Sequence, residues 1–354
     1  MRDILQPPHA FASDDLRLVL ERAGLDGSAA IHALPGGRNN RVFCVDHDRR
    51  RLLLKAYFRT AGDPRDRLRQ EFGFLQYLWR QGVRTAPEPL FADYDLDLAL
   101  YEFIHGRTLQ LDEIGPAYIG DAIRFFRAIN AGRGSAEAQR LPAASEACFS
   151  IRDHLYTVDR RIERVKTIAP CDDAAEEASG FVAGDLVPLW ECVRASVTAA
   201  FDRDGRLPAA LPLDTRCLSP SDFGFHNALV DDAGTVRFLD FEYAGWDDPA
   251  KLICDFANQP DMLLPRPLSR EFERAVVDGD PAPERLAERV RWLQPVYQIK
   301  WSCIILNDFL PFGSDRAQFT GAASGQASRR VAQLGKARRM LKLAELSFAN
   351  AAGR

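Results

Sequence analysis

The order of strand-like and helix-like segments is the feature that most constrains the fold of this chain. In five segments of the N-terminal third, apolar and polar residues alternate, which is the period of half-buried β-strands. These segments are residues 29–35, 41–47, 50–58, 89–95 and 98–104. Between the third and the fourth, "RDRLRQEFGFLQYLWRQG" repeats its apolar residues every three or four positions, as helices do. The pattern predicts a five-stranded antiparallel sheet with one helix inserted after its third strand.

The remainder of the chain is predicted to be mostly helical, with one β-hairpin. Helical periodicity is found in segments 118–132, 148–166, 184–205, 269–277, 283–310 and 327–351. The acidic run at 171–180 is expected to be a solvated loop or the end of a helix. Residues 226–230 and 235–241 flank the turn-like "DDAG" and predict the hairpin. We therefore expect a two-lobed α+β fold, with a sheet-based lobe at 1–104 and a larger, mostly helical lobe at 105–354.

Composition excludes several classes of protein. The net charge of −4 at pH 7 argues against nucleic-acid binding, because proteins that bind nucleic acids non-specifically present a basic surface. No apolar stretch is long enough for a signal peptide or a bilayer span, so no membrane association is expected. The 7 cysteines include no CxxC pair, which argues against a disulfide framework or a zinc ribbon and favours the reducing cytoplasm.

Three oxygen-bearing side chains lie in and just before the predicted hairpin. Asn227 opens its first strand and Asp240 ends its second, so a tight hairpin brings both within reach of one cation. Phosphoryl transfer uses Mg²⁺ held by such oxygens, together with a carboxylate beside the attacking hydroxyl. Asp222 precedes Asn227 in the loop and is placed to be that carboxylate. Taken singly, Asp222 could instead form a turn and Asp240 could cap a strand end.

Lys55 lies in the middle of the third predicted strand, among residues that favour burial. A buried ammonium group needs a partner, and Glu71 on the following helix is the natural one. A strand lysine paired with a helix glutamate holds the α- and β-phosphates of ATP in kinases. The alternative is a lysine whose stem lies along apolar surface and a solvated glutamate.

The turn between the first two strands is rich in glycine and asparagine. It contains Gly36, Gly37, Asn39 and Asn40. Glycines in such a turn let backbone N–H groups approach phosphate oxygens, and asparagine tolerates positive φ. An ordinary hairpin turn would have the same composition, so the turn alone does not distinguish the two interpretations.

Two stretches resemble a known superfamily. "DFGFHN" followed by "VRFLDFEYAGWDDPA" is similar to the aminoglycoside phosphotransferase and choline kinase superfamily, which shares the protein-kinase-like fold. Its members carry a D-x-x-x-x-N loop, a hairpin, an aspartate followed by an aromatic residue, and a D-P pair. "GGRNNRVF" and the strand lysine are similar to the small lobe of the superfamily. The resemblance is strongest over 215–256 and moderate over 33–106.

The resemblance implies a role for each matching residue. Asp222 looks like the catalytic base, and Asn227 and Asp240 look like the magnesium ligands. The letters of Asp222-Phe223-Gly224 copy a kinase metal triplet, but the spacing to Asn227 assigns them to the catalytic loop. The further nucleotide-binding residues that it implies are Gly36, Gly37, Asn39, Asn40, Lys55, Glu71, Glu102, Phe103 and Ile104.

The chain departs from the superfamily pattern at three positions. Many members have a loop-supporting histidine two positions before the catalytic aspartate, where this chain has Pro220. His226 stands where glycine is frequent, and we expect it either to reach a phosphate or substrate or to bond the loop backbone. Glu242 replaces the glycine of a protein-kinase triplet, and no A-P-E signature follows it. The missing A-P-E signature favours a small-molecule acceptor over a protein.

The acceptor is expected to bind in the helical lobe beside the catalytic loop. In the superfamily, acidic residues there commonly hold amino groups, and aromatic rings can hold quaternary ammonium. The candidates are His226, Glu242, Tyr243, Trp246, Asp247, Asp248, Asp255, Trp301 and Asp308. Most have structural alternatives: Asp248 before Pro249 is typical of a helix cap, and Trp301 recurs with other aromatic residues at helical spacing.

Together these features predict an enzyme that uses ATP and Mg²⁺ and transfers the γ-phosphoryl group to a small-molecule hydroxyl. The acceptor could be an aminoglycoside, an amino alcohol, a sugar or a related metabolite. Three other interpretations remain open at this point: a protein kinase-like enzyme, a nucleotide-binding pseudokinase or sensor, and a helical interaction protein without a site. The complete set of Lys55, Asp222, Asn227 and Asp240 argues against the sensor.

Overall fold

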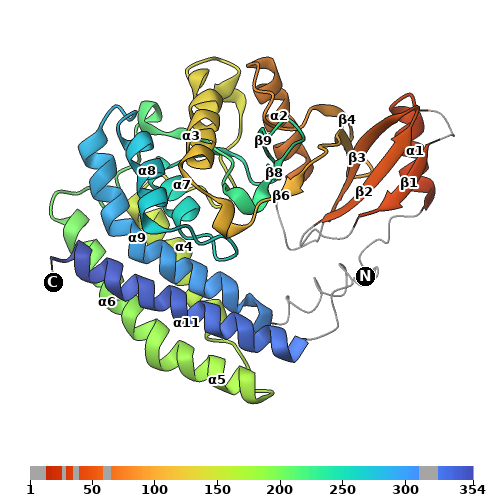
Figure 1. Cartoon of the computed structure of the whole chain (residues 1–354). Coiled ribbons are helices and arrows are strands. Elements are labelled where there is room, and N and C mark those ends of the chain that lie inside the picture. Colours follow the sequence, from red (N-terminus) through yellow and green to blue (C-terminus); the bar gives the residue numbers. More distant parts are fainter. Residues whose placement is uncertain (1–12, 26–28, 35–39, 59–64, 311–325, 354) are drawn as a thin grey trace, which may run out of the picture.

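The computed structural model describes residues 13–25, 29–34, 40–58, 65–310 and 326–353. In these ranges the chain forms a sheet-based lobe and a larger helical lobe, which lie side by side in Figure 1. The predicted α+β class is confirmed. Among the residues that the structure describes, no helix is both long and apolar enough to cross a membrane.

The small lobe is built on one antiparallel sheet. Its strands are β1 (Ala30–Ala33), β2 (Asn40–His47), β3 (Arg50–Tyr57), β4 (Pro89–Asp93) and β5 (Leu98–Glu102). They are ordered β1-β2-β3-β5-β4, and every neighbouring pair is antiparallel. Asp48 and Arg49, between β2 and β3, have φ of 46° and 65°, the left-handed pair that favours a two-residue hairpin. The five-stranded sheet predicted from the alternating segments is confirmed.

The two faces of the sheet pack on different helices. On β3, Leu54 belongs to a small core shared with α1 (Ser13–Arg22). Tyr57 faces the other way and joins the main core with α2 (Arg67–Arg80), the helix predicted after the third strand. Because side chains alternate along a strand, Lys55 lies on the same face as Tyr57 and is turned toward α2.

The larger lobe is mostly helical, as predicted. Its helices are α3 (Pro116–Ala131), α4 (Ile151–Val165), α5 (Asp173–Phe181), α6 (Val187–Asp202), α7 (Pro249–Ala257), α8 (Arg266–Val277), α9 (Pro283–Ile305) and α11 (Gln326–Ala351). Short 3₁₀ segments occur at Leu111–Glu113, Ala138–Arg140, Leu213–Thr215, Phe225–Asn227 and Leu306–Phe309, and a π-helical segment at Val182–Leu186 joins α5 to α6. Figure 1 shows α11 running along α9, with α5 and α6 below it in this view.

The acidic run at 171–180 differs from its prediction, because most of it forms helix α5. Asp172 caps this helix by accepting the Ala175 N–H at 2.8 Å. The buried side chains Ala175, Ala178 and Phe181 hold it against the main core. Acidic residues favour the first turn of a helix, and here tertiary packing completes the element.

Short strands position the loop that contains Asp222. The predicted hairpin is present as β8 (Ala228–Val230) and β9 (Val236–Phe238). Strand β6 (Arg107–Thr108) pairs with β8, and β7 (Cys217–Ser219) pairs with β10 (Gly245–Asp247). The sequence analysis did not include β6, β7 and β10, because two or three residues are too few to show a period.

Candidate active site

The loop that carries Asp222 leaves β7 in a constrained conformation. Ser221 has a φ of 69°, in the left-handed region that residues other than glycine rarely occupy. Its N–H donates to Ser219 Oγ at 2.9 Å, and Lys251 Nζ donates to its Oγ at 3.3 Å. Such backbone strain is concentrated at functional sites, where surrounding contacts hold it in place.

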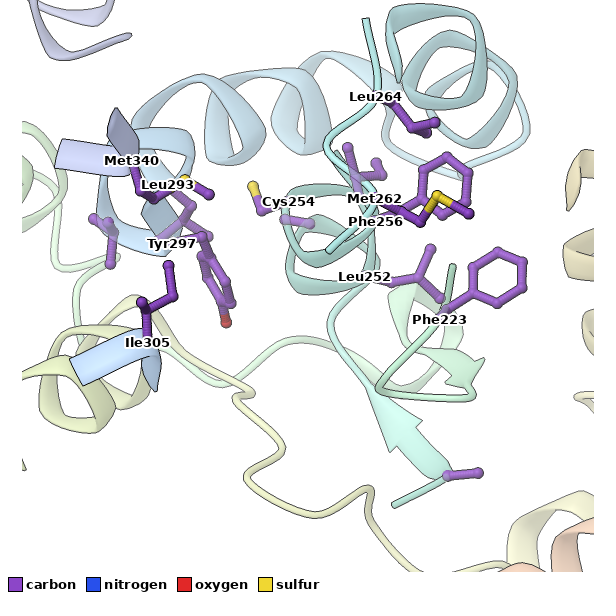
Figure 2. Packing of buried hydrophobic residues seen from close by; sticks show 14 of the residues in the cluster. Phe223, Leu252, Cys254, Phe256, Met262, Leu264, Leu293, Tyr297, Ile305 and Met340 are labelled. Atoms are coloured by element: carbon purple, nitrogen blue, oxygen red, sulfur yellow. The ribbon is translucent and has the colours of Figure 1, made fainter. Parts of the chain in front are cut away.

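Two phenylalanines that follow Asp222 anchor the loop in the main core. Phe223 and Phe225 are 4% and 2% exposed. Phe223 stacks on Phe256 of α7 with 5.3 Å between ring centroids, and Figure 2 shows both side chains among the buried residues of this core. On α3, Phe125 stacks on Phe223 at 5.7 Å. The loop backbone on either side of Gly224 is therefore held by apolar packing.

The Asp222 carboxylate is half-buried, with 36% of its side chain exposed. Its Oδ1 lies 3.2 Å from His226 Nε2 and 3.0 Å from Gln259 Nε2. Burial raises the pKa of Asp222, but hydrogen bonds from His226 and Asn227 lower it more, so the net pKa lies below its usual value. The carboxylate is therefore ionised at neutral pH, as a proton acceptor must be.

Asn227 and Asp240 lie beside each other where the hairpin begins and ends. Asn227 stands one residue before β8, and Asp240 follows β9 by two residues. Leu239, next to Asp240, donates its backbone N–H to Asn227 O at 2.8 Å. Asn227 Nδ2 donates to the backbone oxygen of Asp222 at 3.0 Å, so the amide oxygen Oδ1 is the atom of this side chain that could bind a cation. The Asp240 side chain is 40% exposed.

Lys55 lies between two carboxylates. Its Nζ is 2.7 Å from Glu71 Oε2 and 2.7 Å from Asp240 Oδ1. Lys55 and Glu71 are 7% and 4% exposed. Burial lowers the pKa of Lys55, but the two carboxylates raise it well above its ordinary value, so the ammonium group stays charged. One ion pair joins the sheet of the small lobe to α2, and the other joins it to the segment after the hairpin.

Tyr57 and the segment after Asp240 orient Glu71. Tyr57 Oη donates to Glu71 Oε2 at 2.6 Å and lies 2.7 Å from Tyr101 Oη. Phe241 N–H donates to Glu71 Oε1 at 3.2 Å. Both oxygens of this buried carboxylate are thus bonded. The sequence analysis missed Tyr57, although its position two residues after Lys55 on one strand places both on the same face.

The surroundings of Asp240 carry more negative than positive charge. Burial raises the pKa of Asp240 and Lys55 lowers it. The nearby carboxylates of Glu242 and Glu71 raise it again, to about 7. A bound cation would relieve this repulsion, and the oxygens of Asp240 and Asn227 are ligands that Mg²⁺ prefers.

No cluster of three or more His, Cys, Asp or Glu residues suited to a metal is present in the described ranges. A cation at Asp240 and Asn227 would therefore have few protein ligands. Mg²⁺ at a nucleotide typically takes one or two protein oxygens and completes its coordination with phosphate oxygens and water. The two side chains present are consistent with that chemistry.

The glycine-rich turn is only partly described. Gly36, Gly37 and Asn39 lie outside the described residues. Asn40 opens β2, is 4% exposed, and donates through Nδ2 to Glu242 Oε2. Glu242 is fully buried, and Arg67 Nε lies 4.0 Å from its Oε1. The structure therefore places Asn40 and Glu242 against each other, tying the start of β2 to the segment after Asp240, and leaves Glu242 no surface for an acceptor.

The predicted adenine linker follows the last strand of the sheet. Glu102 ends β5, and its carboxylate accepts from Arg237 at 2.8 Å and from the Glu88 N–H at 3.2 Å. Phe103 and Ile104 are half-buried in the connection between β5 and β6. This connection joins the two lobes, which is where the linker was predicted.

Two aromatic acceptor candidates have structural partners. The ring of Tyr243 lies 5.5 Å from the guanidinium group of Arg65 and 5.9 Å from that of Arg67. Trp246 is in β10, and its Nε1 donates to Ala138 O at 2.9 Å. Both side chains are half-buried. The structure brings neither into contact with Asp222 through a hydrogen bond or ion pair among the described residues.

Trp301 in α9 and Asp308 in the 3₁₀ segment that follows it also form hydrogen bonds within the chain. Trp301 Nε1 donates to Asp255 Oδ1 at 2.9 Å. Asp308 accepts two hydrogen bonds from Arg329 of α11, both at 2.8 Å. The Asp308 carboxylate thus has a cationic partner within the chain before any acceptor binds.

The buried acids of α7 and its N-terminus are paired with protein cations. Asp247 and Asp255 lie 2.8 and 3.4 Å from Lys251 Nζ, and Lys300 Nζ lies 2.5 Å from Asp255 Oδ1. Asp248 caps α7 through the Ala250 N–H at 2.7 Å, as predicted for this D-P pair. The spacing of four residues between Asp247, Lys251 and Asp255 is a signal for such pairs that the sequence analysis did not use.

Comparisons with known proteins bear on the family and the fold of the chain. The chain matches the family model described as "Phosphotransferase enzyme family" over residues 30–289. No protein with a curated description matches it by sequence. In structure it is similar to a spectinomycin phosphotransferase solved with ADP and spectinomycin, at 13% identity and a TM-score of 0.63, over 96% of this chain and 99% of that one.

Two further structures are similar. One is a choline kinase from Cryptosporidium parvum, at 12% identity and a TM-score of 0.57, over 95% of this chain and 100% of that one. The other is a macrolide 2′-phosphotransferase from Brachybacterium faecium, at 18% identity and a TM-score of 0.53, over 91% and 98%. At these identities the likeness establishes the fold alone. Since the family model covers residues 30–289 of 354, the chain belongs to the phosphotransferase enzyme family.

Proposed function

We propose that this protein transfers the γ-phosphoryl group of ATP to a hydroxyl group of a small molecule. The observation that carries the proposal is the contact between Lys55 Nζ and Asp240 Oδ1 at 2.7 Å. It brings the lysine expected to hold phosphates to the carboxylate expected to hold the metal, although 185 positions separate them in sequence. A structural ion pair alone would not need the Asp222 loop and Asn227 beside it.

Each residue has a distinct part in the proposed reaction. Asp222, ionised and partly exposed, accepts or orients the proton of the attacking hydroxyl. Lys55 holds the α- and β-phosphates, and Glu71 keeps its ammonium group in place. Positioning and electrostatic stabilisation supply most of the rate enhancement, because phosphoryl transfer needs little covalent chemistry from the protein.

Mg²⁺ would be held by Asp240 and by the amide oxygen of Asn227, together with phosphate oxygens. Bound there, it would offset the negative charge that develops on the transferred group. The excess of carboxylates around Lys55 supports this assignment. The adenine would lie at the connection formed by Glu102, Phe103 and Ile104.

The proposed acceptor need not carry a positive charge. Asp247, Asp248, Asp255 and Asp308, which could hold amino groups, each form an ion pair with a lysine or arginine of the chain. An amine would have to displace these cations, at the cost of breaking buried pairs at Asp247, Asp248 and Asp255. We therefore include neutral and acidic hydroxyl compounds with amines in the acceptor class.

We place the enzyme in the cytoplasm. All of its cysteines are free thiols: Cys44, Cys148, Cys171, Cys192, Cys217, Cys254 and Cys303. Free thiols persist in a reducing compartment, whereas secreted proteins generally form disulfides.

The test is ADP release from Mg-ATP across aminoglycosides, amino alcohols, neutral sugars, sugar acids and nucleosides. We expect at least one class to stimulate release, and the Asp222→Asn variant to lose that stimulation. Tight binding of ATP without acceptor-dependent release would instead favour a nucleotide sensor. Incorporation of phosphate into added proteins alone would favour a protein kinase-like enzyme.

A further inference from the structure

His226 and Gln259 both contact the proposed catalytic carboxylate, Asp222, at one of its two oxygens. His226 Nε2 and Gln259 Nε2 lie 3.2 and 3.0 Å from the same oxygen, Asp222 Oδ1. The two nitrogens are 3.0 Å from each other. Gln259 is 5% exposed, and the His226 side chain is 15% exposed. Both donors are therefore held out of bulk water against one carboxylate oxygen.

The other ring nitrogen of His226 identifies which tautomer is present. His226 Nδ1 is buried and has no hydrogen-bond partner among the described residues. It packs on Gly224, where an added Cβ would lie 2.8 Å from Nδ1. A proton on Nδ1 would be a buried donor without an acceptor, which costs more than a bare ring nitrogen there. The proton therefore belongs on Nε2, where it can be donated to Asp222.

The amide of Gln259 has one orientation that fits this arrangement. If its oxygen and nitrogen were exchanged, an amide oxygen would face Asp222 Oδ1 at 3.0 Å, and two acceptors would repel. The orientation with Nε2 toward Asp222 gives the carboxylate a second donor, and the charge of Asp222 Oδ1 offsets the repulsion between the two donor nitrogens, which are 3.0 Å apart. Neither donor contacts the other carboxylate oxygen, Oδ2, which is left for the hydroxyl of an acceptor.

We propose that His226 and Gln259 are positioning residues that fix Asp222 Oδ1 by two hydrogen bonds, so that Oδ2 receives the acceptor proton. This inference rests on the proposed function. Pro220, two positions before the aspartate, has no side-chain donor to support the loop, and the two donors come instead from residues that follow Asp222 in the sequence. Gly224, which has no Cβ, leaves room for the imidazole ring of His226.

The test compares two amide replacements of the same histidine. In His226→Gln the amide nitrogen can take the place of Nε2, whereas in His226→Asn it reaches only to the place of Nδ1. We expect His226→Asn to lower kcat by about tenfold to a hundredfold, the loss typical of a hydrogen bond to a charged group, with the KM for ATP little changed. His226→Gln should recover most of that loss. His32→Asn, at an exposed position on β1, serves as the control.

Gln259→Leu provides a second, independent variant. It should lower kcat without changing Mg-ATP affinity in calorimetry, and the double variant with His226→Asn should lose less than the product of the two effects, since both act through Asp222. Equal kcat losses in His226→Asn and His226→Gln, accompanied by equal falls in Tm, would show a merely structural role. Rates at the wild-type level in His226→Asn and Gln259→Leu would also overturn the inference.

The assay uses the full chain with Mg-ATP and the best acceptor of the panel, or water as acceptor with phosphate release as the readout. An inactive Asp222→Asn with fully active His226→Asn and Gln259→Leu removes only this inference. An Asp222→Asn variant at the wild-type rate overturns the proposed function and this inference with it. So does a wild-type protein that shows no ATP turnover, either with any acceptor of the panel or with water.

Discussion

Lys55 and Asp240 form an ion pair between the two lobes, with Nζ 2.7 Å from Oδ1. The same Nζ lies 2.7 Å from Glu71 Oε2, so one buried ammonium group serves a carboxylate from α2 and one from the end of the hairpin. Lys55 is therefore one of the side chains that link the lobes, together with Asn40 and Glu71, and it is the one that contacts the Asp240 carboxylate directly. Changes at this point should affect stability and nucleotide binding together.

Replacement of Lys55 by methionine should destabilise the protein and weaken nucleotide binding. It leaves the buried Glu71 carboxylate without its cation, and breaking such a pair costs on the order of 3 kcal/mol of unfolding free energy. Chemical denaturation gives the stability change, and KM for ATP should rise in parallel. Arg51→Met, which removes an exposed pair with Asp46, is the control and should leave both values unchanged. An increase in acceptor KM alone would place Lys55 in another site.

Replacement of Asp222 by asparagine should remove transfer and preserve the fold. The side chain is 36% exposed, so loss of its charge leaves no unpaired buried partner of opposite sign. General-base positioning is typically worth about 10²- to 10⁴-fold in rate, and we expect a fall of that order in kcat. Circular dichroism and Tm should match the wild type. Transfer at a near wild-type rate would exclude Asp222 as the base.

Replacement of Asp240 by asparagine should weaken nucleotide binding in a magnesium-dependent manner. The variant loses the charge that attracts the cation, and a loss of about 1.4 kcal/mol already lowers affinity tenfold. Calorimetry with ATP should show this fall with Mg²⁺ present and little change when EDTA removes it. Equal affinities for Mg-ATP in the variant and the wild type would contradict the metal assignment.

Replacement of Gly224 by alanine should lower activity through His226. The new Cβ would lie 2.8 Å from His226 Nδ1, so the ring must move away from Asp222. The backbone itself is extended there and accepts alanine without strain. We expect kcat to fall to a similar extent as in His226→Asn. Gly180→Ala in α5, where nothing lies within 4 Å of an added Cβ, should be fully active.

Buried His154 should make stability depend on pH. Burial lowers its pKa, but Cys148 and Asp248 raise it to about 10 from an ordinary value of 6.5. Because the folded-state pKa is the higher one, the stabilisation is complete below about pH 6.5 and is lost as the pH rises toward about 10. Unfolding free energies measured across this window should fall in the wild type more steeply than in His154→Gln.

The exposed His32 provides the control for that measurement, since 63% of its side chain is accessible. His32→Gln should retain the slope of the wild type. An identical pH dependence in His154→Gln and the wild type would show that His154 does not carry the effect.

Local spacing in the sequence determined the strands, most of the helices and the main catalytic candidates. Alternation along 50–58 predicts the strand that holds Lys55, and the interval from Asp222 to Asn227 distinguishes the catalytic loop from a metal triplet. These properties depend on neighbours a few residues apart, which is the range over which strand and helix periods act. The same reasoning anticipated Asp240 at the end of the hairpin.

Only the tertiary structure decided which polar groups meet across the chain. Gln259 reaches Asp222 from 37 positions away, and Asn40 meets Glu242 across 202 positions. No local period reports such contacts, because they arise from how helices and strands pack. Packing also turned the acidic run at 171–180 into α5, since a short helix gains its stability from the buried face that it offers. The sequence alone thus indicated the groups that we propose to react, and the fold decided which side chains contact them.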